Sequence, residues 1–223
     1  NNRLQGPAFG VWLDATPDVT VRENHIRGDT SLRSQDRGNG IHLFNTTGAL
    51  IEGNDISETR DAIYIETANR NTIRGNVMSD LRYGIHYMYS MHNLLENNVT
   101  RGTRTGYALM QSKYLKVFNN RSENDENYGI LMNFITNSEL RNNVVTGVSQ
   151  GQSAGVIISG AEGKAVFIYN SLYNTFEGNY FGHSNIGIHL TAGSEENQVF
   201  NNAFVENQRQ VKYVATRTQS WAE

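Results

Sequence analysis

The sequence predicts an all-β protein, a right-handed parallel β-helix with about 22 residues per coil and about eight to nine coils. The first observation is a repeat: a small residue opens an apolar alternation, and an asparagine follows fourteen residues later. A fixed period of this size is typical of a solenoid. The pairs are Gly40 and Asn54, Ala62 and Asn76, Gly84 and Asn98, Gly106 and Asn120, Gly129 and Asn143, and Ala165 and Asn179.

The second observation is the form of the segments within each repeat. Stretches of four to six residues, β-branched and aromatic, alternate apolar and polar residues and are separated by Gly, Asn, Thr and Ser. A period of two indicates strands, and a helix would need a period of 3.6. Successive strands with no helix between them can pair in parallel only if the chain coils, and the coil is then right-handed.

Each coil is expected to contain an opening strand, a turn, a segment of the form apolar-X-X-Asn, and a second turn. In the opening strand, the first and third residues after the small residue point into the coil. This rule predicts the core residues Ile41, Leu43, Ile63, Ile65, Ile85, Tyr87, Tyr107, Leu109, Ile130, Met132, Val166 and Ile168. Equivalent positions of successive coils form a column along the rod. A second core column lies sixteen residues after the small residue: Ile26, Ile56, Met78, Val145, Phe181 and Phe204.

Two insertions interrupt the repeat. About eight extra residues fall between Asn24 and Gly40, and about fourteen between Asn143 and Ala165, which predicts a loop near residues 149–163. Such loops often build the binding face of a solenoid, but a plain surface loop is equally compatible. We interpret residues 1–223 as a single β-helix domain that is an internal fragment, because no initiator Met or leader pattern is present and the end coils look unfinished.

Composition narrows the function. The chain has a formal net charge of −3, which gives no electrostatic argument for nucleic-acid binding. No apolar run is long enough to predict a direct membrane span. There is no cysteine, so a disulfide framework and a thiolate metal site are both excluded. A soft metal ion would have to be bound by methionine and histidine.

The second and fourth residues after the small residue point outward, and one group of these is unusual. Met88 and Met110 occupy the same column on neighbouring coils, and His86 lies on the same strand and face as Met88. Met91 and His92 follow at the adjacent turn. Thioether and imidazole ligands without thiols favour Cu(I). The alternative is an apolar patch or partner-binding surface, where methionine is also common.

The outward columns do not predict an enzyme. Polysaccharide-cleaving β-helices need paired acid and base side chains, and these columns hold only Asp14 and Glu66, several coils apart. Asp61, Glu123, Asp125 and Glu126 are the nearest approach to a carboxylate cluster. A polysaccharide lyase, an epimerase or a carbohydrate-binding β-helix remains the alternative, because outward aromatic residues could stack on sugar rings: Trp12, Phe44, Tyr64, Phe167 and Tyr169.

Five segments together resemble the NosD family of accessory proteins for nitrous oxide reductase. They are residues 82–90 (RYGIHYMYS), 101–112 (RGTRTGYALMQS), 127–134 (NYGILMNF), 187–195 (GIHLTAGSE) and 211–217 (VKYVATR). The resemblance implies a β-helix related to carbohydrate-binding and sugar-hydrolysing repeats. It also implies copper handling in the periplasm without turnover chemistry. The implied partners are the membrane subunit of an ABC transporter, a lipoprotein copper chaperone and apo nitrous oxide reductase.

The column analysis and the resemblance both favour a transient Cu(I) site at His86, Met88, Met91, His92 and Met110. Met88 and Met110 are expected to supply thioether ligands from adjacent coils, and His86 an imidazole. Met91 or His92 would complete the coordination. Glu66, one coil before Met88, could orient a histidine, although a solvated carboxylate is the alternative.

Overall fold

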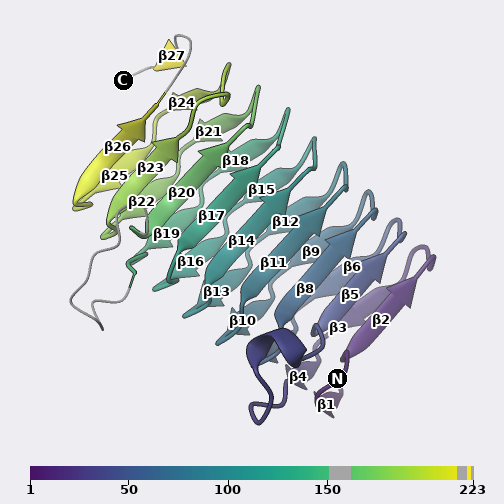
Figure 1. Cartoon of the computed structure of the whole chain (residues 1–223). Coiled ribbons are helices and arrows are strands. Elements are labelled where there is room, and N and C mark those ends of the chain that lie inside the picture. Colours follow the sequence, from purple (N-terminus) through teal and green to yellow (C-terminus); the bar gives the residue numbers. More distant parts are fainter. Residues whose placement is uncertain (151–161, 215–219, 222–223) are drawn as a thin grey trace.

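In the computed structural model, which describes residues 1–150, 162–214 and 220–221, the chain winds into a right-handed parallel β-helix of about nine turns (Figure 1). This confirms the predicted fold class. All strands pair in parallel, each with the equivalent strand of the preceding and following coils. The strands form three sheets that run along the rod, called here sheets 1, 2 and 3.

Sheet 1 is formed by the opening strands of the coils, and it faces the viewer in Figure 1. Its strands are the longest because the apolar alternation is longest here. They are β2 (Val11–Asp14), β5 (Ile41–Phe44), β8 (Asp61–Glu66), β11 (Tyr83–Met88), β14 (Thr105–Met110), β17 (Tyr128–Asn133), β20 (Lys164–Tyr169), β23 (Ile186–Leu190) and β26 (Arg209–Tyr213).

Sheet 2 is formed by the segments that end just before each repeated asparagine. Its strands are β3 (Thr20–Arg22), β6 (Leu50–Glu52), β9 (Thr72–Arg74), β12 (Leu94–Glu96), β15 (Lys116–Phe118), β18 (Glu139–Arg141), β21 (Thr175–Glu177), β24 (Gln198–Phe200) and β27 (Ser220–Trp221).

Sheet 3 follows directly after each asparagine. Its strands are β1 (Arg3–Gln5), β4 (His25–Arg27), β7 (Asp55–Ser57), β10 (Val77–Ser79), β13 (Val99–Arg101), β16 (Arg121–Glu123), β19 (Val144–Thr146), β22 (Tyr180–Gly182) and β25 (Ala203–Val205).

The coil therefore has three strands, where the sequence predicted an opening strand and one further segment. A residue in the left-handed conformation separates sheet 2 from sheet 3 in each coil, for example Gly75 (φ 62°) before Asn76 and Asn97 (φ 56°) before Asn98. This single residue turns the chain through a corner. Glycine and asparagine tolerate that conformation best.

The core fills the space between the three sheets as predicted. All the core residues predicted for the opening strands are at most 1% exposed, including the aromatic Tyr87 and Tyr107. The hydroxyl of Tyr107 donates to the backbone oxygens of Asn98 and Arg121 (2.8 and 2.9 Å), so its burial leaves no polar group without a partner. Met78 and Met132 are fully buried packing residues. Phe204 is only partly buried, because it lies in the last strand of sheet 3.

The repeated asparagines stack into a buried ladder inside the corner between sheets 2 and 3. Each side-chain oxygen accepts hydrogen bonds from the backbone and side-chain nitrogens of the asparagine in the preceding coil, as Asn98 does from Asn76 (3.1 and 2.9 Å). The side-chain nitrogens also donate hydrogen bonds to backbone oxygens of that preceding coil. Its buried members are Asn24, Asn54, Asn76, Asn98, Asn120, Asn143 and Asn179, and the less buried Asn2 and Asn202 end it on either side.

The two insertions leave this frame intact. The first lies between β4 and β5, contains the 3-10 helix η1 (Ser34–Asp36), and projects from the rod near its N-terminal end (Figure 1). Most of the loop predicted near residues 149–163 lies outside the described residues. The coil register resumes at β20, whose Lys164 pairs with Tyr128. In the part of the chain that the structure describes, no helix is long and apolar enough to cross a membrane.

Candidate functional site

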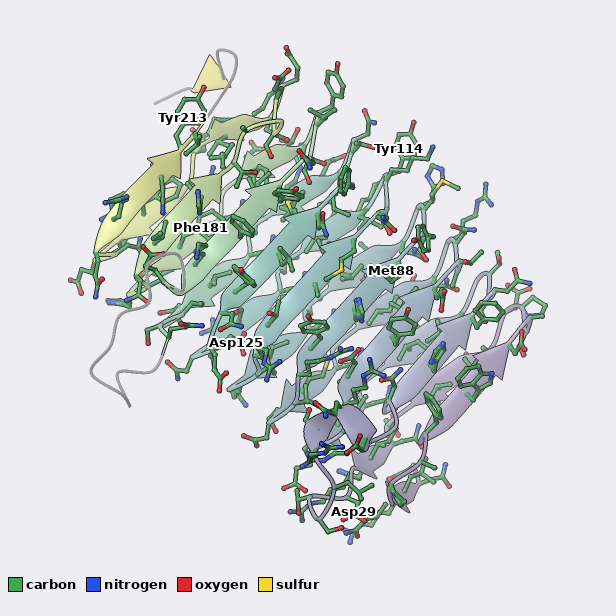
Figure 2. The ribbon with its side chains drawn as sticks, viewed as in Figure 1. Asp29, Met88, Tyr114, Asp125, Phe181 and Tyr213 are labelled. Atoms are coloured by element: carbon green, nitrogen blue, oxygen red, sulfur yellow. The ribbon has the colours of Figure 1, made fainter. Side chains whose placement is uncertain are left out.

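The two predicted sulfur ligands lie side by side on the outer face of sheet 1. Met88 ends β11 and Met110 ends β14, and the two residues are direct register partners in the parallel sheet. Neighbouring strands are roughly 4.8 Å apart, so two long side chains on one face can reach a common atom. Both residues are half-buried, while the neighbouring Tyr87 and Leu109 point inward and are fully buried. Figure 2 shows Met88 among the side chains that cover this face.

His86 lies two residues before Met88 on the same face, and it is less exposed than an outward position suggests, at 9%. Two tyrosine rings pack against its imidazole edge-to-face: Tyr64 of the preceding coil at 4.7 Å and Tyr83 of its own strand at 5.0 Å between ring centroids. The ring is therefore held in one orientation by its neighbours.

A carboxylate that the column analysis left out of the site contacts this histidine. Asp61, the first residue of β8, is 1% exposed, and its Oδ2 lies 3.0 Å from His86 Nδ1. Arg82 donates to both oxygens of Asp61, through Nε at 2.8 Å and Nη2 at 2.6 Å. Its guanidinium also lies over the ring of Tyr83, 4.4 Å from the centroid. The result is a connected group of arginine, aspartate and histidine.

The charge state of Asp61 follows from these contacts. Burial alone would raise the pKa of Asp61, but the hydrogen bonds from His86 and Arg82 and the positive charge of Arg82 outweigh it, and the pKa lies below its usual value. Asp61 is therefore ionised at neutral pH and can only accept hydrogen bonds. His86 Nδ1 must be the donor. In the neutral ring this leaves the lone pair on Nε2, the atom that a metal ion can bind.

Met91 and His92 lie around a corner from the other three residues. Tyr89 has a left-handed backbone (φ 50°) and turns the chain away from sheet 1, and the next residue, Ser90, is buried. Met91 then forms an isolated parallel bridge with Lys113 of the next coil. His92 is exposed, and its ring stacks on Tyr114 at 4.8 Å and an interplanar angle of 7°. The structure thus groups His86, Met88 and Met110, and places the other two on an adjoining narrow face.

A shallow hollow of about 330 Å³ opens on that narrow face. Met91 and Lys113 line it together with the exposed rings of Tyr89 and Phe134. The complete lining is Tyr89, Met91, Gln111, Ser112, Lys113, Phe134 and Thr136. An exposed apolar rim next to two half-buried thioethers gives this corner of the rod an adaptable surface.

The four acidic residues that come nearest to a carboxylate cluster in the sequence lie in separate surroundings. Asp61 joins His86 and Arg82, Glu123 pairs with Arg101 and Arg121 on sheet 3, and Glu126 is exposed. Asp125 is buried elsewhere, among hydroxyl groups. Among the described residues, no group of three or more His, Asp or Glu side chains could hold a metal ion.

Glu66 does not orient the histidine. Burial first, and then the charge and hydrogen bond of Glu66, raise the pKa of Tyr64 to about 12. Asp61 contacts His86 instead. The sequence pattern gave no signal for this contact, because a period of two places Asp61 on the inward side of the strand with Ile63 and Ile65.

Aromatic rings continue along the outer face from His86 toward the N-terminal end. Tyr64 contacts His42 (4.7 Å between centroids), His42 stacks on Trp12 (4.0 Å), and Trp12 meets Phe9 edge-to-face (4.8 Å). Trp12 and Phe9 are about half exposed, at 50% and 46%. His42 is buried within the row, and burial lowers its pKa to about 4, so it is uncharged at neutral pH.

Comparison with known proteins gives one family. The family model described as "Periplasmic copper-binding protein (NosD)" matches residues 22–223. The chain is 64% identical over 221 residues to "Probable ABC transporter binding protein NosD" of Pseudomonas aeruginosa, covering 99% of this chain and 52% of that protein. It is 61% identical over 223 residues to the protein of the same name from Stutzerimonas stutzeri, covering 100% and 51%. The chain thus spans about half the length of these curated relatives.

Two solved structures are similar at low identity. An alginate lyase from Paenibacillus sp. strain FPU-7 is 11% identical with a TM-score of 0.43, covering 94% of this chain and 99% of that chain. The A-module of the mannuronan C-5 epimerase AlgE4 from Azotobacter vinelandii is 15% identical with a TM-score of 0.42, covering 98% and 78%. At these values the two likenesses carry no argument about activity.

Proposed function

Because the chain belongs to the NosD family of periplasmic copper-binding proteins, we propose that it carries Cu(I) as cargo on the outer face of sheet 1. His86, Met88 and Met110 are the proposed ligands. The observation that carries the proposal is the direct register pairing of Met88 with Met110, with His86 two residues away on the same strand. Two thioethers and one imidazole form a soft ligand set that favours Cu(I) over hard cations.

The geometry suits transfer better than storage. Three ligands leave a coordination position for a partner protein to enter, and both methionines are half-buried, so a partner's ligand can approach. His86 is held rigidly, whereas the methionine side chains have three rotatable bonds and can adjust to a moving ion. Met91 and His92, around the corner, are proposed as a second pair of ligands that copper can meet on its way to or from the main site.

The proposed setting is the periplasm, in the maturation of nitrous oxide reductase. The matching family model describes a periplasmic protein, and the two curated relatives are named as binding proteins of an ABC transporter. We propose that this chain works with the membrane subunit of such a transporter, receives Cu(I) from a lipoprotein copper chaperone, and delivers it to apo nitrous oxide reductase. Its part is to carry and present the ion, without a catalysed reaction of its own.

The test is a competition titration against a chromogenic Cu(I) chelator, anaerobically, with wild type and two double variants. Met88→Ala/Met110→Ala should lose at least tenfold in affinity, because two of three ligands are removed. Met91→Ala/His92→Ala also removes one thioether and one imidazole from the same part of the rod, and it should change the affinity far less. Equal affinities for wild type and Met88→Ala/Met110→Ala would eliminate this site.

A second candidate function is the recognition or cleavage of an acidic polysaccharide. The row of aromatic rings from Phe9 to Tyr64 favours it, because sugar rings stack on exposed aromatic faces, and Arg82 and His86 lie at its end. Incubation with alginate or pectin tests it: unsaturated products or an altered uronate ratio would support this function and count against a pure copper carrier.

A further inference from the structure

We propose that Asp61, fixed by Arg82, is a positioning residue that locks His86 in the form protonated at Nδ1, so that Nε2 is the copper-binding atom. The inference rests on the proposed function, because it assigns the orienting group of a proposed ligand. Neither residue was among the sequence-predicted site residues. A carboxylate that accepts the second N–H of a metal-binding histidine sets its tautomer, its ring orientation and its basicity.

The hydrogen-bond directions leave one arrangement. Oδ1 of Asp61 accepts from Arg82 Nε, and Oδ2 accepts from Arg82 Nη2 and lies 3.0 Å from His86 Nδ1. Arginine is always a donor, so it keeps the carboxylate in an accepting role and fixes it in a planar, two-point grip. His86 Nδ1 can then take part in this network only by donating its hydrogen.

Burial distinguishes this pair from the other histidine–carboxylate pairs of the described chain. His25 lies 3.4 Å from Asp55, and His183 lies 3.1 Å from Glu206, but every side chain in these two pairs is about half exposed or more. The side chains of His86 and Asp61 are 11% and 1% exposed. A hydrogen bond shielded from water keeps its geometry, whereas an exposed pair exchanges with solvent.

Replacing Asp61 by asparagine should remove the fixed preference of His86 for the form protonated at Nδ1. An asparagine has one accepting oxygen and one donating nitrogen, and Arg82 supplies donors to both positions. Either orientation of the amide leaves one Arg82 donor facing the amide nitrogen. With the oxygen toward His86, Nδ1 still donates; with the nitrogen toward His86, Nδ1 must accept and the ring carries its hydrogen on Nε2, the atom that copper needs. The variant is therefore expected to populate both forms of the ring.

Nitrogen-15 NMR of the copper-free protein tests this directly, at a pH at which the His86 ring is neutral. Wild type should show His86 with its hydrogen on Nδ1, and Asp61→Asn should shift the ring toward the form with hydrogen on Nε2. Asp55→Asn is the matched control, since it removes the carboxylate of an exposed pair, and it should leave His86 unchanged. The wild-type measurement needs no substitution, so it decides the matter even if Asp61→Asn folds poorly.

Copper affinity provides the second readout. Asp61→Asn should weaken Cu(I) binding by about 10- to 100-fold, the usual loss when an outer partner of a metal-binding histidine is removed, and Asp55→Asn should not weaken it. A wild-type ring protonated at Nε2, or a tautomer unchanged in Asp61→Asn, would overturn the inference whatever the copper data show. The expected tautomers, with His86→Ala binding Cu(I) as tightly as wild type, would instead overturn the proposed function and the copper role of Asp61.

Discussion

Replacing Asn98 by alanine should destabilise the β-helix by several kcal/mol, although the change removes only three heavy atoms far from any ligand. Asn98 lies in the middle of the buried ladder and is 0% exposed. Its side chain accepts from the backbone and side-chain nitrogens of Asn76 (3.1 and 2.9 Å). It also donates to the backbone oxygen of Ile73 and to the side-chain oxygen of Asn120 (2.9 and 3.0 Å).

The magnitude follows from what each partner loses. The backbone N–H of Asn76 loses the acceptor that the ladder gave it, and a buried donor without a partner costs about 1–3 kcal/mol. Other groups keep some bonds: Asn76 Nδ2 still donates to two backbone oxygens, and Asn120 Oδ1 still accepts from the backbone nitrogen of Asn98. Each of the three further lost bonds contributes about 0.5–1.5 kcal/mol. The expected loss is about 3–7 kcal/mol.

Equilibrium urea unfolding followed by circular dichroism measures this loss. Asn97→Gly is the matched control: it removes a neighbouring amide side chain, but Asn97 is exposed and has a left-handed backbone (φ 56°) that glycine adopts freely. We expect a change within about 1 kcal/mol for this control, the size of effect that glycine substitutions have at compatible positions. A loss in Asn98→Ala no greater than that in Asn97→Gly would refute the claim that the ladder holds the coils together.

Two further predictions concern a buried polar cluster in the neighbouring coils. Burial raises the pKa of Asp125, although hydroxyl and backbone donors, including Thr100 and Ser122, partly offset it. Since the folded state holds this proton more tightly than the unfolded chain, the group's unfavourable contribution is present at neutral pH and disappears as the pH falls through the folded pKa. Asp125→Asn should therefore be as stable as wild type or more so at neutral pH, with the difference shrinking in acid, as urea unfolding at both pH values would show; a variant less stable at neutral pH would contradict this. Gly106→Ala should cost about 1–3 kcal/mol by overpacking, because a β-carbon there would lie 2.6 Å from Thr100 Oγ1 and 2.7 Å from Asp125 Oδ2; unchanged thermal unfolding would contradict it.

The sequence was sufficient for the fold and for the pairing of the two sulfurs, for one physical reason. A parallel β-helix places residues one coil apart next to each other, and 22 residues separate Met88 from Met110 without an insertion. The period of two then determines which side chains point outward. The same two rules predicted the buried side chains of Tyr87 and Tyr107.

The sequence did not reveal the corners of the coil or the contacts between side chains that are not register partners. The third strand of each coil follows one left-handed residue such as Asn97, and nothing in the local pattern marks that position as a corner. The corner at Tyr89 similarly separates Met91 from Met88. Asp61 was missed because a period of two places it on the inward side of the strand, with Ile63 and Ile65. Its partner His86 is 25 residues away, one coil plus three, and only the structure shows that the two side chains meet.

X-ray absorption spectroscopy of the Cu(I)-loaded protein tests the central claim most directly, because it counts the atoms bound to the ion. Wild type should show a shell of two sulfur atoms and one imidazole nitrogen. Met88→Ala/Met110→Ala, loaded under the same conditions, should lose the sulfur scattering, whereas Met91→Ala/His92→Ala should retain it. A wild-type shell without sulfur, or sulfur scattering that survives in Met88→Ala/Met110→Ala, would contradict the account.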